Sequence, residues 1–89
     1  MSKVYIVLQD TDDARYIVAA LEADNPAAGV DHQPAMIRVE CEGELWLKRA
    51  TVEENIGRDW DVQELQLSLV SMSGNLDEDE DYFHLYWND

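Results

Sequence analysis

Hydrophobic and polar residues alternate along several stretches of the chain, and this alternation is typical of β-strands that bury one face. These stretches are Lys3–Gln9, Met36–Cys41, Glu44–Arg49, Glu64–Met72 and Tyr82–Trp87. The pattern is clearest in Glu64–Met72. In the first stretch both faces are apolar, because one carries Tyr5 and Val7 and the other carries three aliphatic residues. A strand with two apolar faces is expected in the interior of a sheet.

A helical pattern follows the first strand. The segment Asp10–Asp13 supplies candidate N-cap residues, and its carboxylates suit the positive end of a helix dipole. Hydrophobic residues then recur with helical spacing at Ala14, Ile17, Val18 and Leu21. Because Pro26 disfavours helical geometry at Asn25, the helix is expected to end near Asp24.

The segment from Thr51 to Gly57 predicts a second helix. Thr51 and Glu54 have the spacing of a capping box, and Gly57 can take the left-handed conformation at the C-terminal end. A helix of about two turns is marginal on its own, so it must be stabilised by packing on the rest of the chain.

Turn residues suggest how the strands connect. Glu42–Gly43 can form a tight turn, so Met36–Cys41 and Glu44–Arg49 are predicted to pair as a hairpin. A short extended piece at Val30–His32 precedes them and is separated from them by Pro34. The order is β-α-β-β-α-β-β, with one strand more if the short piece is counted.

This order predicts an α+β fold, with two helices packed on a largely antiparallel sheet. We find no linker and no internal repeat, and we therefore expect residues 1–89 to form a single domain.

The alternation also assigns side chains to faces. If Leu45, Leu47, Phe83, Leu85 and Trp87 face the core with Ile37 and Val39, their neighbours face outward. The outward set is Met36, Arg38, Trp46, Tyr82, His84 and Tyr86. These residue types are enriched in protein interfaces, so they are candidate partner-binding residues, to which we add Asn75 in the Gly74–Asp81 loop. The alternative is that the helices or the C-terminal residues cover this face and form a second small core.

The charge of the chain restricts its partners. It has 6 basic and 20 acidic residues among 89, which gives a formal net charge of −14. Such a chain is repelled by nucleic-acid phosphates and by anionic membranes, and it is attracted to a basic surface on a protein partner.

No residue pattern indicates a metal, a cofactor or a catalytic site. Asp77, Asp79 and Asp81 match the first ligands of a calcium-binding loop, but Tyr82 and Asn88 stand where that loop needs glycine and glutamate. The histidines and the cysteine are not spaced as a local metal site. We therefore expect no cofactor and no enzymatic activity.

Cys41 is the only cysteine, which excludes an intrachain disulfide and fits a reducing compartment. Its position on the same face as Ile37 and Val39 predicts a small core residue. No basic segment followed by an apolar segment opens the chain, so we expect no secretion signal, and no apolar run approaches the roughly 18–20 residues of a membrane span. We expect a cytoplasmic protein, monomeric when free because of charge repulsion.

Several segments together resemble a known family, the effector proteins of bacterial soluble diiron multicomponent monooxygenases, in the phenol hydroxylase branch. In chain order they are Gln9–Arg15, Ala23–Pro26, His32–Arg38, Val52–Leu65, Gly74–Asp81 and Phe83–Trp87. The chain starts almost directly at its first strand, without the long N-terminal tail of the methane monooxygenase branch, which favours a phenol or another aromatic substrate.

The resemblance implies a cofactor-free regulatory protein that binds the diiron hydroxylase component and activates turnover and coupling. From the charge alone, an acidic nucleic-acid mimic that inhibits a DNA-binding protein is the alternative. That alternative requires carboxylates in one stripe at phosphate-like spacing, whereas here they are spread over helix starts, turns and one loop.

Overall fold

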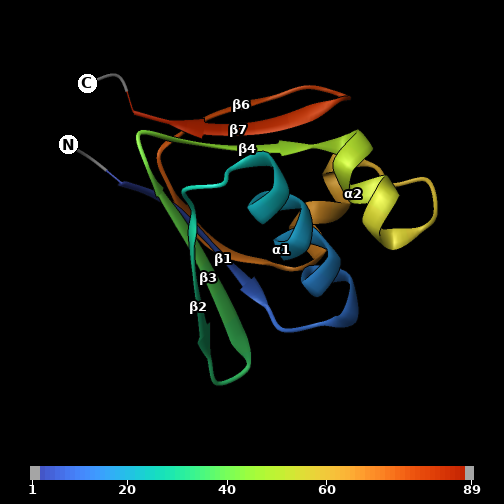
Figure 1. Cartoon of the computed structure of the whole chain (residues 1–89), viewed down its shortest axis with the longest axis horizontal. Coiled ribbons are helices and arrows are strands. Elements are labelled where there is room, and N and C mark those ends of the chain that lie inside the picture. The colour runs from blue at the N-terminus through green and yellow to red at the C-terminus, as the bar shows by residue number, and fades with distance from the viewer. Residues whose placement is uncertain (1–2, 88–89) are drawn as a thin grey trace.

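The computed structural model describes residues 3–87, which form the helices and strands of an α+β fold (Figure 1). In chain order these are β1 (Lys3–Gln9), α1 (Asp12–Asp24), β2 (Gly29–Gln33), β3 (Met36–Glu42), β4 (Glu44–Lys48), α2 (Arg49–Ile56), the 3-10 helix η1 (Val62–Leu67), β5 (Leu69–Ser73), β6 (Asn75–Glu78) and β7 (Tyr82–Tyr86).

The strands form two antiparallel sheets, where the sequence predicted one. The first sheet has the order β2-β3-β1-β5 and the second the order β4-β7-β6. Helix α1 lies between one face of the first sheet and β4, and α2 lies at the end of β4 (Figure 1). The α+β class and the antiparallel pairing are confirmed. The interior position of β1 is also confirmed, because β1 pairs with β3 on one side and with β5 on the other.

Burial follows the predicted hydrophobic positions in β1 and α1. Residues Val4, Ile6 and Leu8 are buried, and α1 buries the whole predicted stripe together with Ala20. The Thr11 side chain caps α1 by accepting a hydrogen bond from the Ala14 backbone N–H at 3.1 Å. The helix ends at Asp24, as expected from the proline that follows.

The second helix begins earlier than predicted. Its first residue is Arg49 and its N-cap is Lys48, which makes no side-chain capping bond. The capping-box interpretation of Thr51 is therefore wrong, because the Thr51 hydroxyl instead donates to Asp24 Oδ1 at 2.9 Å. The predicted end is confirmed, since Gly57 has a φ of 78° in the left-handed region.

The predicted strand Glu64–Met72 is largely wrong. Its first half belongs to η1, and only Leu69–Ser73 is extended. The buried positions Val62, Leu65 and Ser68 are spaced by three, which is the period of a 3-10 helix, whereas Leu67 is 79% exposed. A capping box with Asp61 at its N-cap and Glu64 three residues on begins this helix. Leucine alternation alone does not distinguish the two structures.

The predicted hairpin between β3 and β4 is also wrong. Strand β3 pairs with β1 and β2, and β4 pairs with β7, so the turn at Gly43 leads from one sheet to the other. Gly74 makes the corresponding change between β5 and β6. With a φ of 134° and with Val4 Cγ1 only 2.9 Å from an ideal Cβ, that position requires glycine.

Three further predictions concern the C-terminal half and Cys41. Cys41 is partly buried and packs against the core, as expected. The Gly74–Asp81 segment is not only a loop, because β6 occupies Asn75–Glu78. Phe83 and Leu85 are buried as predicted, but Trp87 follows the strand and is 37% exposed, so its assignment to the core is wrong. Its indole Nε1 donates to the carbonyl of Lys3 at 2.8 Å.

Candidate functional site

The outer face of the second sheet carries four ring side chains side by side. Trp46 on β4 is the cross-strand partner of His84 on β7, and Tyr82 and Tyr86 flank His84 along the same strand. Leu45, Leu47, Phe83 and Leu85 point the other way into the core. We call Trp46, Tyr82, His84 and Tyr86 the aromatic face.

The rings of the aromatic face contact one another. The Trp46 and His84 rings stack with centroids 3.8 Å apart and an angle of 11° between their planes. Tyr86 continues the stack at 5.0 Å from His84, and Tyr82 lies 5.5 Å from Trp46 at a tilted angle of 57°. All four side chains are neither buried nor fully exposed. They form a continuous apolar surface with polar atoms at its edges, as aromatic anchors of interfaces do.

Acidic groups border the aromatic face. Glu44 Oε2 lies 3.1 Å from His84 Nε2, and the Tyr82 hydroxyl donates to Asp77 Oδ2 at 3.2 Å. The hydrogen bond to Asp77 raises the pKa of the Tyr82 phenol above its usual value. Asn75 on β6 also lies on this face, since its cross-strand partner is Tyr86 on β7.

The end of α1 fixes the free edge of β4. The Asn25 side chain, only 7% exposed, donates from Nδ2 to the Trp46 carbonyl at 2.6 Å and accepts from the Trp46 N–H at 2.8 Å. Asp24 accepts from the Lys48 N–H at 3.0 Å. These two side chains provide the hydrogen bonds that a neighbouring strand would provide, so the backbone that carries Trp46 is held on both sides.

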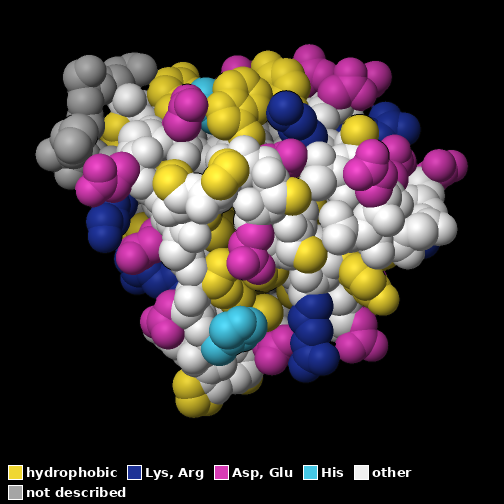
Figure 2. Space-filling model, viewed as in Figure 1, with side chains coloured by type: hydrophobic (Ala, Val, Ile, Leu, Met, Phe, Trp, Pro, Cys, Tyr) yellow, Lys and Arg dark blue, Asp and Glu magenta, His cyan; other side chains and the backbone are white. Residues whose placement is uncertain are grey.

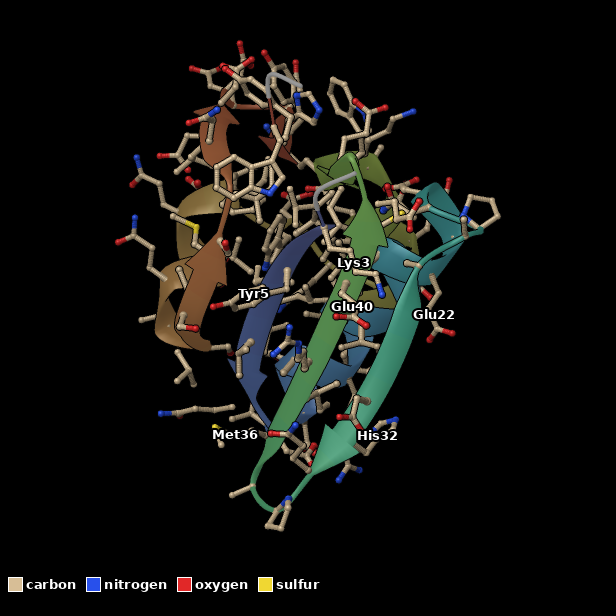
Figure 3. All side chains as sticks on the ribbon, turned by 90° about the vertical axis from the view of Figure 1, so that its left-hand side faces the viewer. Lys3, Tyr5, Glu22, His32, Met36 and Glu40 are labelled. Carbon is tan, nitrogen blue, oxygen red and sulfur yellow. The ribbon has the colours of Figure 1, made fainter. Side chains whose placement is uncertain are left out.

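The structure separates Met36 and Arg38 from the other candidates. Both lie on β3 in the first sheet, so the single outward face predicted for all of them is wrong. The Arg38 guanidinium lies 4.2 Å from the centre of the Tyr5 ring and 3.3 Å from Glu40. Figure 3 shows Tyr5, Glu40 and Met36 on the outer face of the first sheet, with α1 behind it. Among the described residues no helix covers this face.

One hollow adjoins the aromatic face, and a second lies beside the first. The first, of about 510 Å³, is lined by Trp46, Lys48, Arg49, Ala50, Glu53, Asp81 and Tyr82. The other, of about 620 Å³, shares Arg49 with the first and is lined by Asp59, Trp60, Asp61, Val62, Gln63, Glu64, Glu78, Asp79 and Glu80. The first combines rings and aliphatic groups, and the second is strongly acidic.

Four exposed apolar side chains were not among the predicted candidates. Leu67 in η1, Val70 and Met72 on β5, and Leu76 on β6 are each at least 36% exposed. Strand β5 is an edge strand of the first sheet. The sequence contained a signal for this surface, because no charged residue occurs between Glu64 and Asp77 in a chain that is otherwise rich in charge. An uncharged edge strand is a typical place for contact with another chain.

Within residues 3–87 no group of three or more His, Cys, Asp or Glu side chains is placed to hold a metal ion. Asn88, the last position of the calcium-loop comparison, lies outside the described residues. None of the described helices is long and apolar enough to cross a membrane. Every buried side-chain nitrogen or oxygen in the described part has a hydrogen-bond partner. The stacked rings and the acidic groups beside them make the aromatic face suited to recognition of another protein.

Comparisons with known proteins agree on one group. Residues 2–86 match the model of the MmoB/DmpM family. The chain is 56% identical over 86 residues to the phenol 2-monooxygenase stimulatory component DmpM of Pseudomonas sp. strain CF600, a match that covers 97% of this chain and 96% of that protein.

Solved structures give the same result. One chain of a phenol hydroxylase–regulatory protein complex superimposes with a TM-score of 0.93 at 53% identity, covering 98% of this chain and 100% of that one. A second such complex gives 0.90 at 51% identity, covering 97% and 100%. The soluble methane monooxygenase regulatory protein B shares the fold, with a TM-score of 0.75 at 20% identity over 94% of this chain and 64% of that one.

Proposed function

The chain belongs to the MmoB/DmpM family, and we propose that it is the regulatory component of a phenol or aromatic monooxygenase. It binds the diiron hydroxylase component and stimulates turnover and the coupling of electrons to product. It is a non-catalytic accessory protein. The observation that carries this conclusion is the match over almost the full length of both chains to a protein named as a stimulatory component. The solved complexes of related regulatory proteins with phenol hydroxylase support the same partner.

Stimulation by a protein that carries out no chemistry requires a difference in affinity. The regulatory protein must bind the active conformation of the hydroxylase more tightly than the resting one, because equal affinity for both conformations shifts nothing. A coupling free energy of about 1–3 kcal/mol changes the balance roughly 5–150-fold. A rigid acidic domain with an aromatic surface is sufficient for this role.

We propose that the aromatic face, together with Asn75, is the docking surface. Its support is the stacked set of rings, the acidic groups around it, and the double hydrogen bond that fixes the Trp46 backbone. Because Met36 and Arg38 lie on the other sheet, we propose them as a separate contact. Residues 1–89 would act as a single domain, monomeric when free and located in the cytoplasm. The net charge of −14 and the absence of a second cysteine support these last points.

The experiment is steady-state phenol oxidation by the purified hydroxylase and its reductase, with and without this protein. Product formation and coupling should rise as the protein is added and should saturate near one protein per active site. The control is heat-denatured protein at the same concentrations. Unchanged turnover and coupling at every ratio would refute the proposed function.

A further inference from the structure

We propose that the smaller hollow beside Trp46 receives an apolar side chain of the hydroxylase, projecting from a basic surface. This inference rests on the proposed function and deepens it, because it names a specific contact within the docking surface. The hollow has a volume of about 510 Å³ and lies between the start of α2 and the aromatic face. Its apolar walls are the rings of Trp46 and Tyr82 and the methyl group of Ala50.

Three of the four charged side chains that line this hollow already have partners, whereas the fourth, Lys48, forms no ion pair within residues 3–87. Glu53 accepts from the Trp60 N–H at 2.9 Å and lies 3.4 Å from Arg49 Nε. Asp81 lies 4.0 Å from the same guanidinium. A charged occupant would have to compete with these pairs. An apolar occupant leaves them in place and removes ring surface from water, as in the central pockets of protein interfaces.

The surroundings of the hollow determine the character of the partner surface. Arg49 also lines the adjoining, larger hollow. That hollow carries the carboxylates of Asp59, Asp61, Glu64, Glu78, Asp79 and Glu80. In Figure 2 yellow hydrophobic and magenta acidic side chains lie close together at the top of the view, over the second sheet. Because opposite charges across an interface steer docking, the apolar side chain should stand among lysines or arginines of the hydroxylase.

Filling the hollow tests the proposal. Ala50 is exposed on α2, so Ala50→Phe places a ring into the hollow without changing charge. The matched control is Asn55→Phe, an exposed position of the same helix that does not line the hollow.

Binding to the purified hydroxylase is measured by isothermal titration calorimetry, and the thermal stability of each variant is measured by a melt. We expect Ala50→Phe to raise Kd about tenfold or more, as blocking of an anchor pocket does, and Asn55→Phe to leave Kd unchanged. Ala50→Leu should have an intermediate effect, and it repeats the test with a smaller side chain.

The outcomes separate the two proposals. If the wild-type protein does not bind the hydroxylase, the proposed function itself fails. If the wild type binds and Ala50→Phe and Ala50→Leu bind equally well, the hollow receives no side chain, while the proposed function stands. Equal weakening by Ala50→Phe and Asn55→Phe also overturns the inference, since it indicates general contact with α2.

Two other occupants are tested with the free protein. Saturable calorimetric binding of phenol that is lost in Ala50→Phe would assign the hollow to a small aromatic molecule. A dimer in sedimentation experiments that Ala50→Phe dissociates would assign it to a second copy of the chain. Either result overturns the inference.

Discussion

At the scale of single residues, Trp46 is held through both its backbone and its ring. The Asn25 side chain forms hydrogen bonds with the N–H and the carbonyl of Trp46, and the His84 ring stacks on the Trp46 indole with ring centroids 3.8 Å apart. A side chain that is already ordered loses little entropy on binding, so its contacts contribute more to affinity. This is why we regard Trp46 as the central anchor of the docking surface.

Neighbouring positions on β4 provide the first test. Trp46→Ala should weaken hydroxylase binding by about 1–3 kcal/mol and largely preserve the fold, as expected of an aromatic anchor. Leu47→Ala should instead lower the free energy of unfolding by about 2–5 kcal/mol, because Leu47 is fully buried. Thermal melts and activation titrations of both variants are the measurements. A severe loss of stability in Trp46→Ala with little loss in Leu47→Ala would contradict the assigned faces.

The Asn25 side chain provides the second test. Asn25→Ala leaves the N–H and carbonyl of Trp46 without these partners, so we expect a loss of about 1–3 kcal/mol in the free energy of unfolding. Asn75→Ala, at an exposed asparagine, is the control and should change stability by less than about 0.5 kcal/mol. Urea denaturation of the three proteins measures the difference. Equal stability of Asn25→Ala and wild type would show that water replaces the Asn25 amide.

At the scale of elements, Glu53 connects α2 to the segment after it. The hydrogen bond from the Trp60 N–H, assisted by Arg49, lowers the pKa of Glu53 below its usual value. A lowered folded-state pKa means that this stabilisation is present above the unfolded-state pKa and is lost as pH falls through the folded-state value. The free energy of unfolding should therefore decrease in the acidic range, and less so in Glu53→Gln. Glu54→Gln removes an equal charge from the same helix and should keep the wild-type profile. The measurement is the urea midpoint of each variant at a series of acidic pH values. Identical pH profiles of the two variants would exclude a stabilising role for the Glu53 carboxylate.

The end of the same helix gives a further prediction. Gly57 has a φ of 78°, so Gly57→Ala should cost about 1–2 kcal/mol through left-handed strain, although an ideal Cβ there meets no atom within 4 Å. Gly29→Ala is the control, since its Cβ would meet only Glu40 Cγ at 4.0 Å and its φ is not in that region. Chemical denaturation should separate the two variants. A Gly57→Ala protein as stable as Gly29→Ala would mean that the turn relaxes.

The elements also show which parts of the fold local sequence determines. Strand β1 and helix α1 were predicted with their boundaries, because their periodicity, capping residue and following proline all act within a few positions. The hairpin was wrong because the partner of a strand is a tertiary property, and β4 pairs with β7 some forty positions away. The strand predicted for Glu64–Met72 was wrong because the leucines at every second position suggest a strand, whereas the buried residues Val62, Leu65 and Ser68 recur at every third position.

At the scale of the whole molecule, the charge of −14 should act on the rate of docking. We expect the association rate constant with the hydroxylase to fall as ionic strength rises from about 20 to 300 mM, because salt screens attraction to a basic surface. Dissociation should change less. Stopped-flow mixing over this range is the measurement. A constant association rate would show that the charge serves solubility and not steering.

The residues of the aromatic face could be predicted from the sequence, but the extent of this face could not. Period-two alternation requires Trp46 to point away from Leu45 and Leu47, so the outward orientation could be predicted. It could not show that Met36 and Arg38 belong to a different sheet, since both sheets give the same alternation. The hollow beside Ala50 was not predictable, because it depends on how α2 sits against β4 and β7.

The two ends of the described chain lie next to each other. The Trp87 N–H donates to the Gly43 carbonyl at 3.1 Å, and the Trp87 indole reaches the Lys3 carbonyl. A short peptide could therefore join these ends, and the chain could be reopened at the exposed turn between β2 and β3. Such a circular permutant would keep the aromatic face intact while changing the order in which its strands are synthesised. The same closeness makes this fold suitable for insertion, as a whole cassette, into a surface loop of another protein.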